Sequence, residues 1–399
     1  MRRIDLKRDS VARADTIRSI NRRIILNYVR ERSPISRAEI AQETALQRST
    51  VSLIVSELME DGLVEEIEGE STGGRPPTLL RLRAAGPVAI GVAVGTVETV
   101  VATSDLGGRV LEQEEFPTAR SSDEVLRRVV ERIRKLMRGK IRGSIEGIGV
   151  SLPGLVDYEN GNALFVPYFK WRDWGVKRAV EDATGLPVVV DNDANAAALA
   201  ELWFGRPEIR EVRDFIMVLV EEGLGTGIVF DGQVYRGESG AAGEFGHMTI
   251  GSAAPISCAS GSRDCWEAFA CERTALARYQ KHSRRTGAQR EVTFAQLIDR
   301  AFEGDRAARN ALLRTAHYLG VGIANLIKGL SPEAVIVGGR ISRAWPLIAN
   351  DLKKAVAKSS VCRGLPPPRI DVSSLGEQPQ LMGALSLVLT SKFASVATA

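Results

Sequence analysis

The chain has 399 residues, which is enough for two or three domains of ordinary size. Hydrophobic residues make up 44% and charged residues 26%, which excludes a disordered or low-complexity protein. No apolar run is long enough to span a membrane, and the N-terminus lacks the apolar stretch of a signal peptide. We therefore expect a cytoplasmic protein with no membrane partner.

The net charge of +4 is unevenly distributed along the chain. Residues 1–37 carry eleven Lys and Arg against four Asp and Glu, whereas residues 38–83 carry four against nine. A basic segment favours a polyanion such as DNA, although a solvated face is the alternative interpretation.

Residues 16–83 predict a winged helix-turn-helix domain. Apolar spacing indicates a helix over 16–31, and Ser36 with Glu39 forms a capping box at the start of a second helix that ends at Thr44. A third helix begins at Gln47 and ends before Gly62. The segments LVEEI and TLLRLR are typical of two strands, which form a hairpin wing around EGESTGGRPP.

The third helix is the predicted recognition helix, because its apolar stripe faces inward and leaves other residues near its N-terminus outward. The predicted DNA contacts are Arg37, Gln47, Arg48, Ser49, Thr50, Ser52 and, at the tip of the wing, Arg75. The alternative is an ordinary packing module, since seven acidic residues between Glu57 and Glu70 would repel DNA if they faced it.

From residue 88 onward the chain alternates between strand and helix patterns, which is typical of an α/β fold. After a linker over 84–87, we expect a first lobe over 88–205 and a second over 206–395. Both lobes open with three consecutive strand patterns, and two such lobes predict a ligand cleft between them. Three aromatic residues, Phe165, Tyr168 and Trp171, line one wall of this cleft or belong to the core.

Several motifs together give the chain a resemblance to the ROK family, which contains bacterial sugar kinases and sugar-responsive transcriptional repressors. They are SRAEIA, DLGGRVL, GVSLPGLVD, DNDANAAALAE, GTGIVFDGQVYRG, AAGEFGH and SPEAVIVGG. The resemblance implies a two-lobed actin-like ATPase (ribonuclease H-like) fold behind the winged helix-turn-helix. Within the family, the chain is similar to the subgroup of N-acetylglucosamine-, glucose- and xylose-responsive repressors.

The resemblance also implies a sugar pocket, with Asp193 at the position of the family's general base. The implied sugar contacts are Asn192, Asp193, Glu244, His247 and Glu267. Carboxylates, an amide and an imidazole suit a ring of hydroxyl groups that both donate and accept hydrogen bonds. A structural carboxylate cluster is the alternative.

The phosphate side departs from the family's pattern. ROK kinases carry an early DxGGT loop, whose counterpart here is AVGTV with Ala93 at the Asp position. The residues that match the remaining phosphate and adenosine loops are Gly223, Gly225, Thr226, Gly227, Gly338 and Gly339. Tight strand turns also need glycine, so we predict a sugar pocket with a decayed nucleotide side and no enzyme activity.

The family's zinc site uses a His followed by CxCGxxGCxE. Here His247, Cys258 and Cys265 match, and Ser260 replaces the middle cysteine. A serine hydroxyl is a poor zinc ligand, so zinc binding would require water or Cys271 as the fourth ligand. The alternative is that the two matching cysteines are packing residues.

These features predict a sugar-responsive transcriptional regulator, which represses carbohydrate uptake or catabolism genes. Its predicted partners are double-stranded operator DNA, a sugar or sugar-phosphate effector and further copies of itself in a homodimer or tetramer. One alternative is an ATP-dependent sugar kinase with an added DNA-binding arm. Another is a protein whose DNA binding is controlled by docking of a transport protein.

Overall fold

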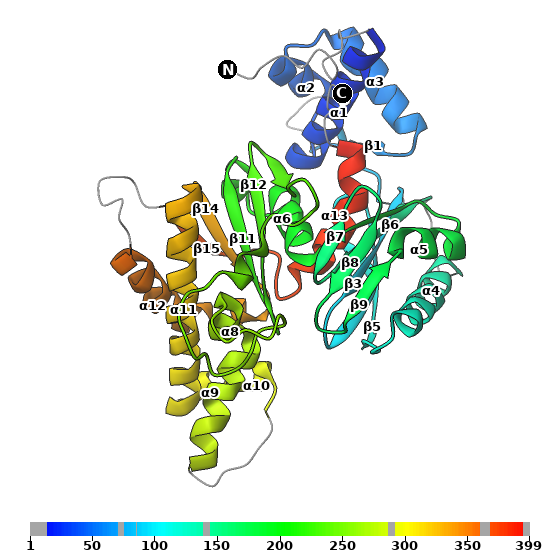
Figure 1. Ribbon diagram of the computed structural model, residues 1–399. Coiled ribbons are helices and arrows are strands. Elements are labelled where there is room, and N and C mark those ends of the chain that lie inside the picture. The colour runs from blue at the N-terminus through cyan, green and yellow to red at the C-terminus, as the bar shows by residue number, and fades with distance from the viewer. Residues whose placement is uncertain are drawn as a thin grey trace.

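The computed structural model describes residues 14–70, 76–84, 86–138, 144–285, 292–359 and 368–393. A small helical domain lies at one end of two α/β lobes (Figure 1). Arg75, the predicted DNA contact in the wing, lies outside the described residues. Within these residues, no helix is both long and apolar enough to cross a membrane.

The N-terminal domain is a winged helix-turn-helix, as predicted. Its elements are α1 (Ala14–Arg32), α2 (Arg37–Thr44), α3 (Arg48–Glu60), β1 (Val64–Glu68) and β2 (Thr78–Leu82). The Ser36–Glu39 capping box is present at the start of α2. The two strands pair antiparallel, and Ile35 adds a short bridge to Leu80. This bridge ties the wing to the turn before α2.

The first lobe is a five-stranded sheet in the order β10-β6-β3-β4-β5, with α4 and α5 on one of its faces. Its elements are β3 (Val88–Val94), β4 (Glu98–Ser104), β5 (Val110–Pro117), α4 (Ser122–Arg138), β6 (Ile145–Leu152), α5 (Val176–Thr184) and β10 (Val188–Asn192). A side sheet of β7 (Leu155–Asp157), β8 (Asn162–Val166) and β9 (Trp171–Trp174) lies beside it. The apolar faces of α4 and α5 pack on the main sheet.

The second lobe repeats this strand order with β13-β12-β11-β14-β15. Its strands are β11 (Phe215–Val220), β12 (Leu224–Phe230), β13 (Gln233–Tyr235), β14 (Ala334–Gly338) and β15 (Arg369–Val372). Its helices are α7 (Pro207–Arg210), η1 (Glu244–His247), α8 (Trp266–Ala270), α9 (Glu272–Arg285), α10 (Phe294–Phe302), α11 (Arg306–Leu330), η2 (Arg340–Ala344) and α12 (Trp345–Ser359). In both sheets three antiparallel strands continue into two parallel ones, so the predicted repeat of the opening strands is confirmed.

Two helices lie between the sheets, α6 (Asp193–Phe204) and α13 (Pro379–Phe393) (Figure 1). They pack against each other, α6 on β11 and β12 and α13 on β3 and β6. The helix α13 therefore packs on strands of the first lobe, although it follows the second lobe in the chain. Its C-terminal half also shares one apolar cluster with α1, α3 and the wing, so the N-terminal domain packs directly on α13.

Candidate functional site

A cavity of ≈ 430 Å³ lies between the two lobes. Its walls come from the turn after β3, from β8, from the N-terminus of α6, from the turn between β11 and β12, and from η1 and α8. All five predicted sugar contacts, which are Asn192, Asp193, Glu244, His247 and Glu267, line it. The structure thus brings together residues that lie up to 75 positions apart in the sequence.

Asn192 and Asp193 stand at the junction of β10 and α6. The Asn192 side chain caps the helix, since its Oδ1 accepts from the backbone N–H groups of Ala194 and Asn195 at 2.9 and 3.1 Å. Its Nδ2 donates to the Gly154 carbonyl at 3.0 Å. Burial in the cleft raises the pKa of Asp193 to about 6. Asn192 therefore positions the helix end, and Asp193 supplies a carboxylate whose protonation changes near neutral pH.

The opposite wall carries Glu244, His247 and Glu267. Glu244 Oε2 lies 3.8 Å from His247 Nε2, and burial raises the pKa of Glu244. Glu267 is held more firmly, because its Oε1 accepts from the Ala259 N–H at 2.9 Å and from Arg273 Nη2 at 3.1 Å. The wall thus offers one imidazole, one half-exposed carboxylate and one fixed carboxylate to hydroxyl groups of a ligand.

The aromatic wall contains two of the three predicted residues. Phe165 and Tyr168 line the cavity. Trp171 instead lies in the core of the first lobe, stacked on Phe169 with ring centroids 4.3 Å apart, and its indole N–H donates to the Arg120 carbonyl at 2.7 Å. Its place on β9, directed toward the main sheet, makes it a packing residue.

The glycines that match the phosphate loops fall into two groups. Gly223, Gly225 and Thr226 line the cavity. Gly227 packs against α6, where an added Cβ would meet the Ala194 carbonyl oxygen at 2.3 Å, and Gly338 is closed off by Met217. Gly339 adopts a positive φ of 90° beside the Val220 carbonyl. Close packing and backbone conformation account for these last three glycines.

The region beside Ala93 holds a charged cluster that no sequence motif predicts. Arg340, at the start of η2, forms ion pairs with four carboxylates: Glu98 at 3.6 Å, Glu221 at 3.3 Å, Glu222 at 2.6 Å and Glu272 at 3.1 Å. Because Glu98 belongs to the first lobe and the others to the second, the arginine joins the lobes. Burial raises the pKa of Glu272 to about 8. The single positive charge of Arg340 is therefore shared by four acidic side chains.

A second bond also crosses between the lobes here. Thr96 Oγ1, in the turn after β3, donates to Glu222 Oε2 at 2.7 Å. The only sequence signal for this region is the pair Glu221 and Glu222 directly before the GLGTG motif. Nothing local identifies Arg340 as their partner.

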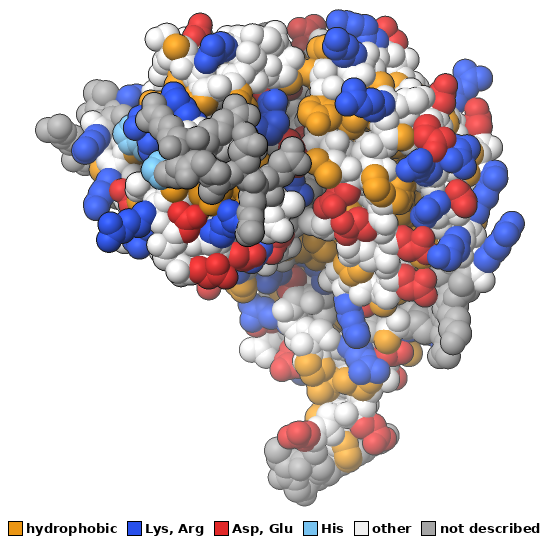
Figure 2. Space-filling model, turned by 90° about the horizontal axis from the view of Figure 1, so that it is seen from below, with side chains coloured by type: hydrophobic (Ala, Val, Ile, Leu, Met, Phe, Trp, Pro, Cys, Tyr) orange, Lys and Arg blue, Asp and Glu red, His pale blue; other side chains and the backbone are white. Residues whose placement is uncertain are grey.

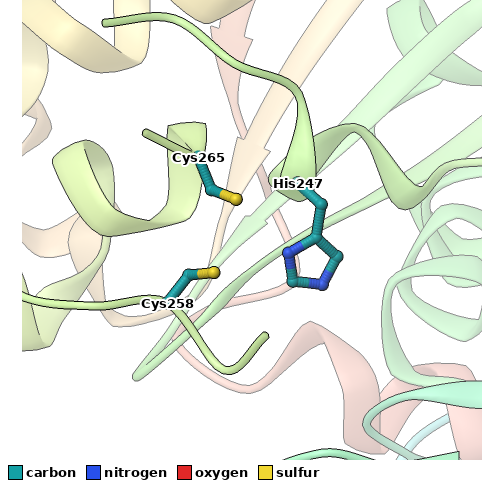
Figure 3. Close-up of side chains that lie close together, drawn as sticks. All are labelled: His247, Cys258 and Cys265. Carbon is teal, nitrogen blue, oxygen red and sulfur yellow. The ribbon is translucent and has the colours of Figure 1, made fainter. Parts of the chain in front are cut away.

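His247, Cys258 and Cys265 form a third cluster. Their ligand atoms all lie within 4.8 Å of one another, and Figure 3 shows both thiols and the imidazole directed toward a common centre. Ser260 Oγ lies 2.9 Å from the Cys258 sulfur and 4.0 Å from the Cys265 sulfur. Cys271 does not belong to this cluster, because its thiol is buried beside Thr274 at 3.2 Å.

The DNA-binding residues predicted on α3 are placed as expected for a recognition helix. Gln47, Arg48 and Ser49 are exposed, Thr50 and Ser52 are half-buried, and Leu53 is 55% exposed beside them. Arg37 behaves differently. Its guanidinium donates to the Ser52 carbonyl at 3.2 Å and to Glu66 at 2.9 Å, so it joins α2, α3 and the wing.

Several acidic residues at the C-terminal end of α3 and after it are paired within the domain. Glu57 and Asp61 pair with Arg18 and Arg22 of α1, and Glu65 pairs with Arg81 at 2.7 Å. The basic and acidic segments seen in the sequence thus compensate each other. At the opposite end of the molecule, basic and acidic side chains are intermixed on the lobes (Figure 2).

Comparisons with known proteins agree with this architecture. The model of the ROK family matches residues 89–391, and that of a winged helix-turn-helix DNA-binding domain matches residues 18–65. The chain belongs to the ROK family. It is 32% identical to the xylose repressor of Caldicellulosiruptor bescii, over 94% of this chain and 96% of that protein. It is 28% identical to the N-acetylglucosamine repressor of Escherichia coli O157:H7, over 87% and 86% of the two chains.

Solved structures of ROK proteins show the same fold. A ROK family transcriptional regulator described as a homologue of the E. coli MLC protein superposes with a TM-score of 0.79 at 26% identity, covering 96% of this chain and 98% of that one. A ROK family glucokinase from Streptomyces griseus, in complex with glucose and AMPPNP, superposes with a TM-score of 0.70 at 28% identity. That likeness covers 76% of this chain and 99% of the glucokinase. The expected two-lobed kinase-type fold behind a winged helix-turn-helix is therefore confirmed.

Proposed function

We propose that this ROK protein is a sugar-responsive transcriptional repressor that binds operator DNA and controls carbohydrate uptake or catabolism genes. The observation that carries this proposal is the presence, in one chain, of an exposed recognition helix and a cleft lined by hydroxyl-binding side chains. The similar proteins named as xylose and N-acetylglucosamine repressors support it.

On DNA, the N-terminal end of α3 enters the major groove. Arg48 has no hydrogen bond or ion pair to any described residue, so its guanidinium is free to read a guanine edge. Gln47, Ser49, Thr50 and Ser52 lie beside it, whereas Arg37 acts by bracing the helix. Two copies of the chain would place two such helices on a palindromic site, with half-sites one helical turn apart.

In the cleft, a sugar hydroxyl donates to the Asp193 carboxylate, and other hydroxyls are bound by Glu244, His247 and Glu267. Because the relatives at 30–33% identity are xylose repressors, xylose is the first ligand to test. A sugar that binds one arrangement of the lobes more tightly shifts the equilibrium toward it and thereby changes the spacing of the recognition helices.

The kinase alternative rests on Asp193, which stands where a general base is required. The charges on the nucleotide side, beside Ala93 and Arg340, argue against it. Polyphosphate entering there would face four carboxylates balanced by one arginine. Phosphoryl transfer depends on positioned positive charge, so we infer that the chain does not act as a kinase.

We further propose that His247, Cys258 and Cys265 hold a zinc ion. The residues fit, because two thiols and an imidazole are common zinc donors and the buried Nδ1 of His247 has no hydrogen-bond partner among the described residues. Such an ion would hold the loop over 258–265 in place beside the cleft. It would also orient the His247 side chain toward the cleft. Ser260 lies at the remaining side of the cluster.

The test is capture of sheared genomic DNA by the purified full-length protein at near-physiological salt, followed by sequencing. We expect enrichment of a few palindromic sites beside sugar genes, and release of the DNA when xylose or another sugar transported by those gene products is added. Retention without sequence preference, combined with ATP-dependent phosphorylation of a sugar, would overturn the proposal in favour of the kinase.

A further inference from the structure

A second cavity, of ≈ 360 Å³, lies where the N-terminal domain meets the lobes, away from the sugar cleft. Its walls come from α1, the C-terminal ends of α6 and α13, and Arg210 of α7. Figure 1 shows α1 resting on the end of α13 at this junction. A molecule bound here would contact the DNA-binding domain and the ROK domain at the same time.

This junction cavity gathers an unusual number of unsatisfied polar atoms. Ten buried side-chain nitrogen or oxygen atoms among the described residues have no hydrogen-bond partner, and four of them belong to this cavity. They are Nε and Nη1 of Arg30, Nε of Arg210 and Oδ1 of Asn27. Leaving such atoms unpaired destabilises a fold, so their concentration in one cavity points to a ligand.

The orientation of these atoms is fixed by the protein. The Arg30 side chain is 7% exposed, and its guanidinium lies over the rings of Trp203 and Phe393, 4.9 and 4.8 Å from their centroids. Its Nη2 donates to Glu31 at 2.7 Å. The remaining N–H groups, at Nε and Nη1, are buried and have no hydrogen-bond partner among the described residues. Asn27 donates through Nδ2 to the Phe393 carbonyl at 2.8 Å, which directs its Oδ1 elsewhere.

The charge of the cavity selects an anion. Arg30 and Arg210 line it together with one acidic residue, Glu31. A single Glu31 oxygen lies 2.7 Å from Arg30 and 3.7 Å from Arg210, so one carboxylate is shared by two guanidinium groups. Arginine edges match the oxygens of phosphate in geometry and charge. The unpaired oxygen of Asn27 additionally requires a donor, such as a hydroxyl group.

We propose that the junction cavity binds a small phosphate ester that carries a hydroxyl group. Arg30 and Arg210 bind the phosphate, and Asn27 accepts from the hydroxyl. Since Asn27 and Arg30 belong to α1 and Arg210 to α7, the bound ester ties the DNA-binding domain to the second lobe. The site is separate from the sugar cleft and does not depend on the function proposed for that cleft.

Isothermal titration of the full-length protein with glycerol 3-phosphate, inorganic phosphate and glycerol, at fixed pH and ionic strength, tests this site. We expect glycerol 3-phosphate to bind, inorganic phosphate to bind less tightly, and glycerol not to bind. Arg210→Gln should weaken binding of glycerol 3-phosphate by at least about tenfold, the loss expected for a hydrogen bond to a charged group. Arg30→Met should abolish it.

Two control variants test whether the ester binds at the junction cavity and not at a surface arginine or in the sugar cleft. Arg178→Gln removes an arginine that is 90% exposed on α5, and Asp193→Asn alters the sugar cleft; both should leave the titration unchanged. Arg210 is 28% exposed at the rim, so its variant reports on the site even if Arg30→Met fails to fold. Absence of binding at millimolar ester, or equal binding by wild type and Arg210→Gln, would overturn the proposal.

Discussion

Glu98 makes the inter-lobe cluster sensitive to pH. A hydrogen bond with Glu115, together with burial, raises the pKa of Glu98 to about 7. That hydrogen bond between two carboxyl groups requires one of them to be protonated. In Glu98→Gln the amide keeps a hydrogen-bond donor but cannot ionise. The variant therefore separates the effect of protonation on stability from the effect of packing.

The contribution of Glu98 to the free energy of unfolding falls as the pH rises. Because the pKa in the folded protein lies above the ordinary value of 4.5, the folded state holds a proton that the unfolded state has released. The resulting stabilisation is fully present below pH 4.5 and is lost as the pH rises through about 7. The shift corresponds to at most about 3 kcal/mol. Since the side chain is 31% exposed, solvent screening reduces this to about 1–2 kcal/mol.

Urea unfolding followed by tryptophan fluorescence, at several pH values between 5 and 8.5, measures the effect. The wild type should lose about 1–2 kcal/mol more free energy of unfolding across this range than Glu98→Gln does. Glu112→Gln, which removes an exposed carboxylate from the neighbouring strand, is the matched control and should follow the wild type. Parallel pH profiles for the wild type and Glu98→Gln would show that Glu98 does not carry this proton.

Three further predictions concern the DNA interface, the sugar cleft and the metal cluster. Arg48→Ala should weaken operator binding by about 1–3 kcal/mol in fluorescence anisotropy, and unchanged affinity would remove Arg48 from the recognition surface. Sugar affinity, measured by titration calorimetry, should fall as the pH drops below about 6, where Asp193 becomes protonated; Asp193→Asn should bind weakly at every pH. Purified wild type should contain one zinc per chain by elemental analysis and Cys258→Ala much less, whereas equal metal in both would exclude Cys258 as a ligand.

The sequence predicted the elements whose signals are local. The capping box at Ser36 and Glu39 and the apolar stripe of α3 each lie within a few helical turns, and both are present in the structure. Motifs predict the sugar contacts, and the fold brings all five of these residues to one cleft. The charge pattern was harder to interpret, because pairing of Arg18 with Glu57 and of Arg22 with Asp61 depends on how α1 crosses α3.

Long-range contacts were beyond sequence reasoning. Arg340 meets carboxylates from positions 98 to 272, and no spacing rule connects them. Trp171 was a candidate for the cleft wall or the core, and it lies in the core of the first lobe at the start of β9, where the next two residues are exposed. Arg37 is predicted from the sequence to contact DNA, and in the structure its guanidinium donates to the Ser52 carbonyl and to Glu66. The partners of Arg340 and of Arg37 lie 15 or more positions away in the chain.

The helix α6 provides a direct physical connection between the sugar cleft and the DNA-binding domain. It begins at Asp193 in the cleft and ends at Phe204, about 18 Å away at the usual helical rise. At that far end, Trp203 and Phe204 lie under the guanidinium of Arg30 in α1.

Both lobes hold this helix closely. An added Cβ at Gly227 of β12 would meet the Ala194 carbonyl oxygen at 2.3 Å, and one at Gly383 of α13 would meet Ala196 at 2.4 Å. With so little clearance, a change in the angle between the lobes has to move α6 relative to β12 or to α13. Because α1 rests on the ends of both α6 and α13, movement between these two helices reaches the recognition domain without any change in the linker.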